Sequence, residues 1–333
     1  MRTKLDVGTH RPFAQLSFWR TSIDAILIVG SQVRHEAPLI NVRLRKAAKR
    51  GAKIFLIGPE WDTTFACEFL GEDAGLLHDL PGHVADAFKD AARPAIIVGP
   101  GGLAANALHP ALVLASEWNL ARDIDGEAWN GFNVIHTAAA RMGAVMLGYA
   151  QKGGIKDVID AAPAVLLSLG ADSLDYSKFE NSLKVYIGHH GDAGAHAADI
   201  ILPAASYAEK DGTYVNTEGR VQFAEKAVFA PGDAREDWTI LRALADAFGV
   251  TVGFDSFAQL QSAMIEAVPA LGEEGLAPLG KLPKGKKTPK AKGAITYPIA
   301  DPYLTNPIAR ASETMQRCSA ELVHGEDLLE AAE

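Results

Sequence analysis

Residues 99–104 carry a glycine pattern that phosphate-binding proteins use. They read G-P-G-G-L-A, follow an apolar run and precede a helical pattern. The order matches G-x-G-x-x-A, in which backbone N–H groups at a helix N-terminus meet a pyrophosphate. Pro100 removes one of those N–H groups, and Asp123 is only loosely placed as the acid that would bind a ribose. We therefore favour a structural turn over a nucleotide site.

Residues 188–196, GHHGDAGAH, gather imidazoles and a carboxylate that could bind zinc or iron: His189, His190, Asp192 and His196. The spacing fits no standard helical metal motif, because three glycines interrupt the segment. We predict a turn whose histidines bond to backbone carbonyls, and no metal site.

A polar stretch further on contains candidates for a general base, namely Glu209, Lys210, Asp211 and Glu218. Turn-rich polar segments more often carry solvated charges than catalytic ones. The sequence has no Gly-x-Ser-x-Gly elbow, Walker loop or His-Glu-x-x-His. The lysine-rich segment 281–292 is predicted to be a solvated linker. We therefore predict no catalytic residue.

The elements that position these residues are predicted to form parallel α/β sheets. Short apolar runs rich in Val and Ile occupy residues 25–30, 53–58, 95–99, 164–170, 184–188 and 199–203. Runs of this kind are typical of strands buried on both faces. Helical patterns lie at residues 37–50, 104–118, 131–147 and 235–248, the last with capping-box spacing between Asp233 and Glu236. The alternation predicts a doubly wound sheet, and residues 213–223 predict a hairpin.

Composition excludes several classes of protein. The 333 residues carry a formal net charge of −9, so no basic field draws nucleic acid. No apolar stretch of about 18 residues is present, so we expect no membrane span, and the N-terminus does not resemble a signal peptide. The two cysteines, Cys67 and Cys318, cannot hold a cluster or a structural zinc without outside ligands. We expect unpaired thiols in a reducing cytoplasm.

Two segments are more specific than these patterns. Residues 189–222 read HHGDAGAHAADIILPAASYAEKDGTYVNTEGRVQ, and residues 28–46 read IVGSQVRHEAPLINVRLRK. Both resemble hallmarks of the molybdopterin oxidoreductase superfamily. The Gly188–Asp192 segment and Arg235-Glu-Asp-Trp238 are similar to the branch of that superfamily found in respiratory complex I, the NADH–quinone oxidoreductase, as its large iron–sulfur subunit. The resemblance covers residues 23–320.

The resemblance implies a scaffold without a catalytic centre in the peripheral arm of complex I. The parent subunit is expected to carry 4Fe-4S and 2Fe-2S clusters in an N-terminal part, and this chain is expected to hold no cofactor and no metal. Partners would be the other peripheral-arm subunits, at the cytoplasmic face of the bacterial inner membrane. The alternative is a fragment of a molybdopterin-dependent oxidoreductase that keeps a pterin cleft. The residues matching that cleft are Gly30, Arg34, Asp211, Asn216, Glu218 and Arg220.

The expected fold is α/β, with doubly wound parallel sheets of the molybdopterin-oxidoreductase type, a short hairpin and an extended C-terminal tail. Residues 1–22 match nothing in the family. Residues 23–90 would form a partial Rossmann-like lobe, incomplete at its N-terminus and with an exposed sheet edge. Residues 91–255 would form a second α/β lobe, and residues 256–333 a Lys/Pro-rich linker followed by a tail that packs on a partner or on its own domain.

Overall fold

A computed structural model describes residues 23–124, 126–149, 153–216, 219–275, 282 and 291–326. The chain forms two compact units. Within the described residues, the first unit runs to Met146 and adds Tyr214–Gln222 and Gly272–Ala300. The second unit comprises Leu147–Thr213, Phe223–Leu271 and the chain from Asp301 onward.

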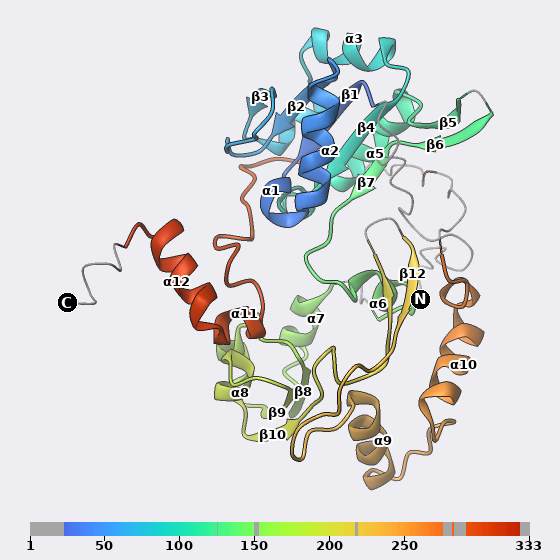
Figure 1. The fold of residues 1–333 in the computed structure, drawn as a ribbon, viewed down its shortest axis with the longest axis vertical. Coiled ribbons are helices and arrows are strands. Elements are labelled where there is room, and N and C mark those ends of the chain that lie inside the picture. The colour runs from blue at the N-terminus through green and yellow to red at the C-terminus, as the bar shows by residue number, and fades with distance from the viewer. Residues whose placement is uncertain are drawn as a thin grey trace. The chain divides into compact units, whose positions relative to one another are not determined.

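The first unit is built on a five-stranded parallel sheet (Figure 1). Its order is β3-β2-β1-β4-β7, with β1 Ala25–Val29, β2 Lys53–Ile57, β3 Glu68–Gly71, β4 Pro94–Val98 and β7 Phe132–Val134. Every residue of β1 and β4 is buried, as expected for central strands covered on both faces. The first described strand is thus central, with a hydrogen-bonded neighbour on each side.

Helices cover both faces of this sheet. Leu27 and Val29 point into a core formed with η2 Ala74–His78, α3 Gly82–Asp90 and α5 Leu108–Glu117. Ile26 and Ile28 point the other way, into a core formed with α1 Val33–Glu36 and α2 Pro38–Ala48. The alternation follows from the two-residue period of a strand. The unit also contains α4 Pro100–Ala104, the antiparallel hairpin of β5 Ala121–Ile124 and β6 Glu127–Asn130, and α6 Arg141–Met146.

The second unit contains a smaller parallel sheet of order β10-β9-β8, with β8 Val165–Leu169, β9 Leu183–Gly188 and β10 Ile200–Pro203. Its other elements are α7 Ile155–Asp160, η3 Tyr176–Phe179, α8 Ala193–Ala197, α9 Asp237–Ala247, α10 Phe257–Ala267, η4 Pro269–Leu271, α11 Pro307–Ala311 and α12 Glu313–Leu322. Strands β11 Gly212–Val215 and β12 Val221–Ala224 form the hairpin predicted at 213–223.

Strand β8 lies at the edge of the second sheet and exposes one apolar side. Val165, Leu167 and Leu169 are 50%, 50% and 47% exposed, whereas the alternate residues Leu166 and Ser168 are buried. A parallel sheet is normally covered on both faces. One apolar face of β8 is therefore uncovered within the second unit.

The six predicted strands are all present as β1, β2, β4, β8, β9 and β10, and the sheets are parallel. The expected lobe boundary between residues 90 and 91 lies inside the first unit, because β4 pairs with β1 along its whole length. The helix predicted at 131–147 is wrong over its first half, where β7 pairs with β4. Helix α9 begins after the N-cap Glu236, whose side chain makes no cap bond, so the capping box is also wrong.

The region 256–333 contains more regular structure than a linker and tail. Helix α10 begins after Ser256, whose hydroxyl accepts a hydrogen bond from Gln259 N, and α12 begins in the same way after Ser312. Most of the lysine-rich segment 281–292 lies outside the described residues. Among the residues that the structure describes, none of the helices has the length and apolar character needed to cross a membrane.

Candidate functional site

The strand order of the first sheet places a ligand crevice at the carboxyl ends of β1 and β4. The chain leaves β1 toward β2 on one side and returns to β4 on the other. Open α/β sheets bind ligands outside such a reversal point. Two sequence-predicted features, Gly30 and the glycine pattern at 99–104, both lie there, because each follows one of these two strands.

The backbone groups of this crevice are already bonded to each other. Gly101 N and Gly102 N donate to Gly30 O at 3.0 and 3.2 Å, and Leu103 N donates to Gly99 O at 2.9 Å. These are the N–H groups that a pyrophosphate would need. The motif begins the short helix α4, and its N–H groups bond within the protein. Asp123 caps the β5–β6 hairpin instead, since its Oδ1 accepts from Gly126 N at 2.8 Å.

Glycine is required here because two backbones approach closely. Gly30 has φ +59°, and a Cβ built on it would lie 2.0 Å from Gly102 N. A Cβ on Gly99 would lie 2.3 Å from Ser31 Cβ. A side chain cannot lie this close to another chain segment. Glycine is therefore required where Gly30 and Ser31 approach residues 99–102.

A segment from the C-terminal region lies over the same junction. A Cβ on Gly101 would lie 2.3 Å from Thr296 O, and one on Gly58 would lie 2.8 Å from Tyr297 Oη. Tyr297 Oη donates to Pro59 O at 2.7 Å, just beyond the end of β2. Thr296 and Tyr297 therefore lie over the crevice of the first unit. Its residues do not fit a pterin cofactor with a pyrophosphate group, although the superfamily implies one.

A buried carboxyl group sits beside this junction. Ser31 Oγ donates to Glu36 Oε2 at 2.5 Å. Burial raises the pKa of Glu36, and the Ser31 hydrogen bond only partly offsets that rise. The folded state thus binds a proton at Glu36 more tightly than the unfolded chain does.

Glu36→Gln is expected to stabilise the first unit by about 1 kcal/mol at neutral pH. Because the folded pKa is raised, the stability linked to Glu36 is fully present below the unfolded pKa, near 4.5, and is lost as pH rises through the folded pKa. The glutamine variant should therefore gain most at pH 7 and little at about pH 4. Urea unfolding at both pH values measures the difference. Glu117→Gln, at an exposed position in α5, is the control for simple charge removal, and an equal gain there would contradict the prediction.

Several of the residues that matched a pterin cleft bond to other protein groups. Arg34 pairs with Asp62 at 2.7 Å on the surface. Asn216 and Arg220 bond to each other through the hairpin turn, with Asn216 Oδ1 accepting from Arg220 N at 3.0 Å. Asp211 belongs to the second unit, where its Oδ1 accepts from Lys226 N at 2.7 Å. Glu218 lies outside the described residues.

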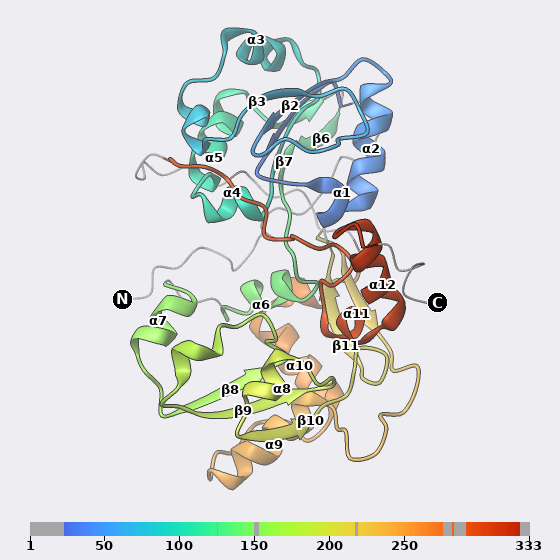
Figure 2. The ribbon, with the colours of Figure 1, turned by 90° about the vertical axis from the view of Figure 1, so that its left-hand side faces the viewer.

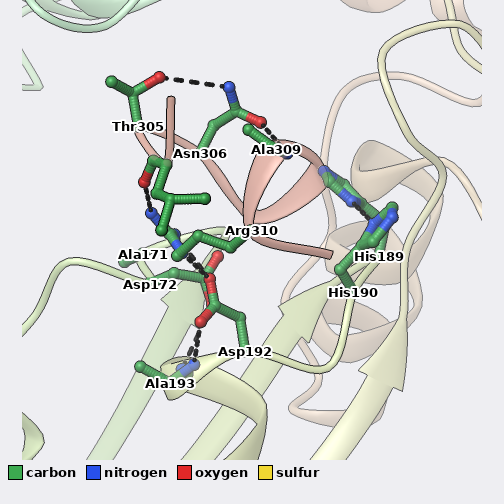
Figure 3. Close-up of polar contacts among 12 residues, drawn as sticks. Ala171, Asp172, His189, His190, Asp192, Ala193, Thr305, Asn306, Ala309 and Arg310 are labelled. Carbon is green, nitrogen blue, oxygen red and sulfur yellow. Dashed lines mark hydrogen bonds and ion pairs between the residues drawn. The ribbon is translucent and has the colours of Figure 1, made fainter. Parts of the chain in front are cut away.

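A second polar cluster lies at the carboxyl edge of the second sheet (Figure 3). The loop after β8 supplies Asp172, and the loop after β9 supplies His189, His190 and Asp192. Tyr186 Oη donates to both carboxylate oxygens of Asp172, at 2.9 and 3.0 Å. Burial raises the pKa of Tyr186, as does its bond to Asp172, so the phenol stays a donor.

The glycines of this loop make room for the Tyr186 ring. A Cβ on Gly188 would lie 2.2 Å from Tyr186 Oη, and one on Gly194 would lie 2.4 Å from the ring. Glycine at positions 188 and 194 is thus explained by packing around one buried tyrosine. The two histidines do not bond to backbone carbonyls as predicted, because their Nδ1 atoms lie 2.6 Å apart and bond to each other.

The charges in this cluster have protein partners. Arg310 reaches from α11 and places both Nε and a terminal nitrogen 2.6 Å from Asp192 Oδ2 (Figure 3). Burial alone would raise the pKa of Asp192, but the Arg310 and Ala193 hydrogen bonds bring it below its usual value. Burial and the neighbouring His190 lower the pKa of His189. Lys210 pairs with Asp237, and Glu209 accepts from Ser206 N at 2.9 Å.

The two thiols are free, as the sequence predicted. Burial, with Glu68 beside it, raises the pKa of Cys67 to about 12. Metal ligation needs the thiolate, so this environment is unsuited to a cluster ligand. Over the described ranges, no three His, Cys, Asp or Glu side chains gather as a metal site would require.

Tyr297 and Arg310 were not identified from the sequence. Tyr297 bonds to the loop after β2, and Arg310 bonds to Asp192 in the loop after β9. Only the interpretation of residues 297–320 as a tail packing on its own domain pointed to them. Both of these contacts join residues more than a hundred positions apart in sequence. No local pattern carries that information.

Comparisons with known proteins agree along the chain. The model of the molybdopterin oxidoreductase family matches residues 20–247, and that of the C-terminal region of the NADH-ubiquinone oxidoreductase G subunit matches residues 265–318. A similar protein is the mitochondrial NADH-ubiquinone oxidoreductase 78 kDa subunit of Neurospora crassa, 39% identical over 331 residues. That alignment covers 95% of this chain and 44% of the relative.

Two further relatives are also NADH-ubiquinone oxidoreductase subunits. The NADH-ubiquinone oxidoreductase 75 kDa subunit of Reclinomonas americana is 34% identical over 89% of this chain and 45% of its own length. The mitochondrial 78 kDa subunit of Candida albicans is 36% identical over 89% of this chain and 42% of its own length. The chain thus spans somewhat less than half the length of these curated relatives.

Proposed function

The chain belongs to the molybdopterin oxidoreductase family, and from this premise we propose that it is a non-catalytic scaffold segment of the large iron–sulfur subunit of NADH–quinone oxidoreductase. The relatives bear the names of the 75 and 78 kDa subunits of that enzyme. The whole complex would pass electrons from NADH through iron–sulfur clusters to quinone, coupled to proton translocation. This segment would bind the other peripheral-arm subunits at the cytoplasmic face of the membrane.

One observation carries the absence of a catalytic role. The region that matches the C-terminal model of the complex I subunit, residues 265–318, includes Thr296 and Tyr297. These two residues lie against Gly101 and Gly58, at the crevice where an α/β sheet would hold a ligand. The part of the chain that matches the complex I subunit model thus contacts the loops at that crevice, which supports the proposed absence of a cofactor.

The exposed edge of the second sheet supports a binding role. Val165, Leu167 and Leu169 present apolar side chains at alternate positions of β8, each about half exposed. Contiguous exposed apolar surface commonly marks a protein–protein interface. We place the contact with the rest of the complex on this side of β8.

Purification of the full chain, alone and after co-expression with the other peripheral-arm subunits, tests the proposal. Native mass spectrometry gives the assembly, and elemental analysis gives molybdenum and iron. We expect the chain to join the other subunits and to carry neither metal itself. A stoichiometric pterin or molybdenum on the chain alone would instead support the alternative, an oxidoreductase fragment with a working pterin cleft.

Leu167→Asp is expected to reduce co-purification with the other subunits by at least about tenfold, because a charge in an apolar contact must be desolvated without a partner. The isolated chain should keep its unfolding midpoint, since Leu167 is 50% exposed. Leu39→Asp is the matched control on the first unit, where Leu39 is 68% exposed in α2. Capture that is unchanged in the Leu167 variant, or equally lost in both, would contradict the placement of the interface on β8.

A further inference from the structure

Residues 291–297, here named the strap, are anchored at both ends of the crevice in the first unit. Ala291 and Ile295 are only 2% and 1% exposed and belong to the core beneath the sheet. Tyr297 is fixed at the other end by its bond to Pro59 O. In Figure 2 the strap is the orange-red coil that runs beside α4.

Backbone hydrogen bonds hold the strap along its length. Ile295 N donates to Glu72 O at 2.9 Å, and Ala74 N donates to Gly293 O at 3.1 Å. Asp73 adds to this pairing, because its carboxylate accepts from Gly293 N at 3.2 Å. The strap is therefore paired with the chain that leaves β3, much as an added strand would be.

We propose that the strap is a permanent internal occupant of the ligand crevice at the carboxyl ends of β1, β2 and β4, and that it closes this crevice to pyrophosphate-bearing cofactors. The inference rests on the proposed function and deepens it, because it names the segment that excludes a cofactor from the first unit. It rests on the contacts of Thr296 and Tyr297 with the glycine loops.

The contacts leave no room for a phosphate at the glycine pattern. Thr296 O lies 2.3 Å from the place where a Cβ on Gly101 would stand. The Thr296 carbonyl oxygen and a phosphate oxygen are both acceptors, so they repel each other and cannot occupy the same position next to Gly101. The N–H groups of Gly101 and Gly102, moreover, already donate to Gly30 O.

The hydroxyl of Tyr297 acts as a fixed donor. Burial and the nearby Glu36 raise its pKa, so the group stays protonated at neutral pH. It donates to Pro59 O, near the start of the loop after β2. The strap thus supplies the loop after β2 with a hydrogen-bond donor, a role that a bound ligand could otherwise fill.

Two variants of the full chain test the proposal by hydrogen exchange. Gly101→Ala puts a methyl group against Thr296 O and should displace the strap, because the backbone there cannot yield as a flexible side chain would. We expect exchange at the Ile295 and Ala74 amides to rise by at least about a hundredfold, while exchange at Ile28 and Ile97 in the sheet stays slow. Gly82→Ala is the control, since a Cβ there meets nothing within 4 Å.

Tyr297→Phe is the second variant, for the case that Gly101→Ala does not fold. It removes one hydroxyl and should speed exchange at Ile295 by about fivefold. The wild-type chain, probed with ADP in equilibrium dialysis, should bind none. Amides of Ile295 and Ala74 that exchange as in an unfolded chain, their unchanged exchange in both variants, or ADP binding by the wild type would each overturn the proposal.

Discussion

Gly30→Ala is expected to destabilise the first unit by about 3–5 kcal/mol, the sum of backbone strain at positive φ and of overpacking. Gly30 has φ +59°, and its Cβ would lie 2.0 Å from the backbone nitrogen of Gly102. Both backbones belong to loops at the ends of central strands, so neither can move without disturbing β1 or β4. A variant with this change should unfold at a much lower urea concentration than the wild-type chain.

Gly51→Ala isolates the strain from the clash. Gly51 also has positive φ, +93°, but a Cβ there meets nothing within 4 Å. We expect a loss of only about 1 kcal/mol. Urea unfolding followed by tryptophan fluorescence compares the two variants. Similar losses in both would show that the Gly30–Gly102 approach is not a rigid contact, and the close packing of the crevice would lose its main support.

The buried strands are the part of this fold that local sequence determines best. Runs such as Ala25–Val29 and Pro94–Val98 are apolar at every position, which suits only a strand covered on both faces. Glycine directly after a run also indicated where each strand ends. The parallel arrangement followed from the helical patterns between the runs.

Strand β7 shows where local patterns are insufficient. Phe132–Val134 comprises only three residues, and the apolar spacing that continues after it resembles a helix. The strand exists because β4 offers an unpaired edge, and because Asn133 Nδ2 bonds to Ile96 O and Gly131 O, at 3.3 and 2.9 Å. Tertiary pairing thus overrides the local periodicity.

The candidate site, like the fold, could be predicted only in part from local sequence. The preference for a structural role at residues 99–104 came from Pro100 and the loose placement of Asp123, and the structure shows a short helix there whose N–H groups bond to Gly30 O. The strap was not predictable, since Tyr297 contacts Pro59 across 238 residues of sequence. Its residues read as an ordinary tail, and only the folded sheet shows that they lie over a crevice.

The two units differ in how much apolar surface they bury. The large core clusters belong to the first unit. The second unit leaves Leu167, Ile200 and Ile201 about half exposed on its sheet. We therefore expect the first unit to be stable by itself and the second to gain stability from the partner that covers β8.

Phe88→Ala is the sharpest test of this asymmetry. Phe88 is 1% exposed, stacks on Trp118 with ring centroids 4.0 Å apart and also contacts Phe55. Its loss should destabilise the first unit by about 3–5 kcal/mol, since the cavity cannot collapse between a helix and a sheet. Phe69→Ala on β3 is the control, because that ring is 39% exposed, and we expect a loss of about 1 kcal/mol.

Hydrogen exchange locates the effect of the Phe88 variant. If the units are energetically separate, the amides of Ile96 and Ile97 in β4 should exchange faster, and those of Val185 and Ile187 in β9 should be unchanged. That result would mean that the first unit is stable without the second. Changes at the exposed face of β8 would then leave the stability of the sheet that holds the strap unchanged. Equal acceleration in both sheets would mean that the two units unfold together. The second unit would then gain its stability from the first unit, and not from a partner that covers β8.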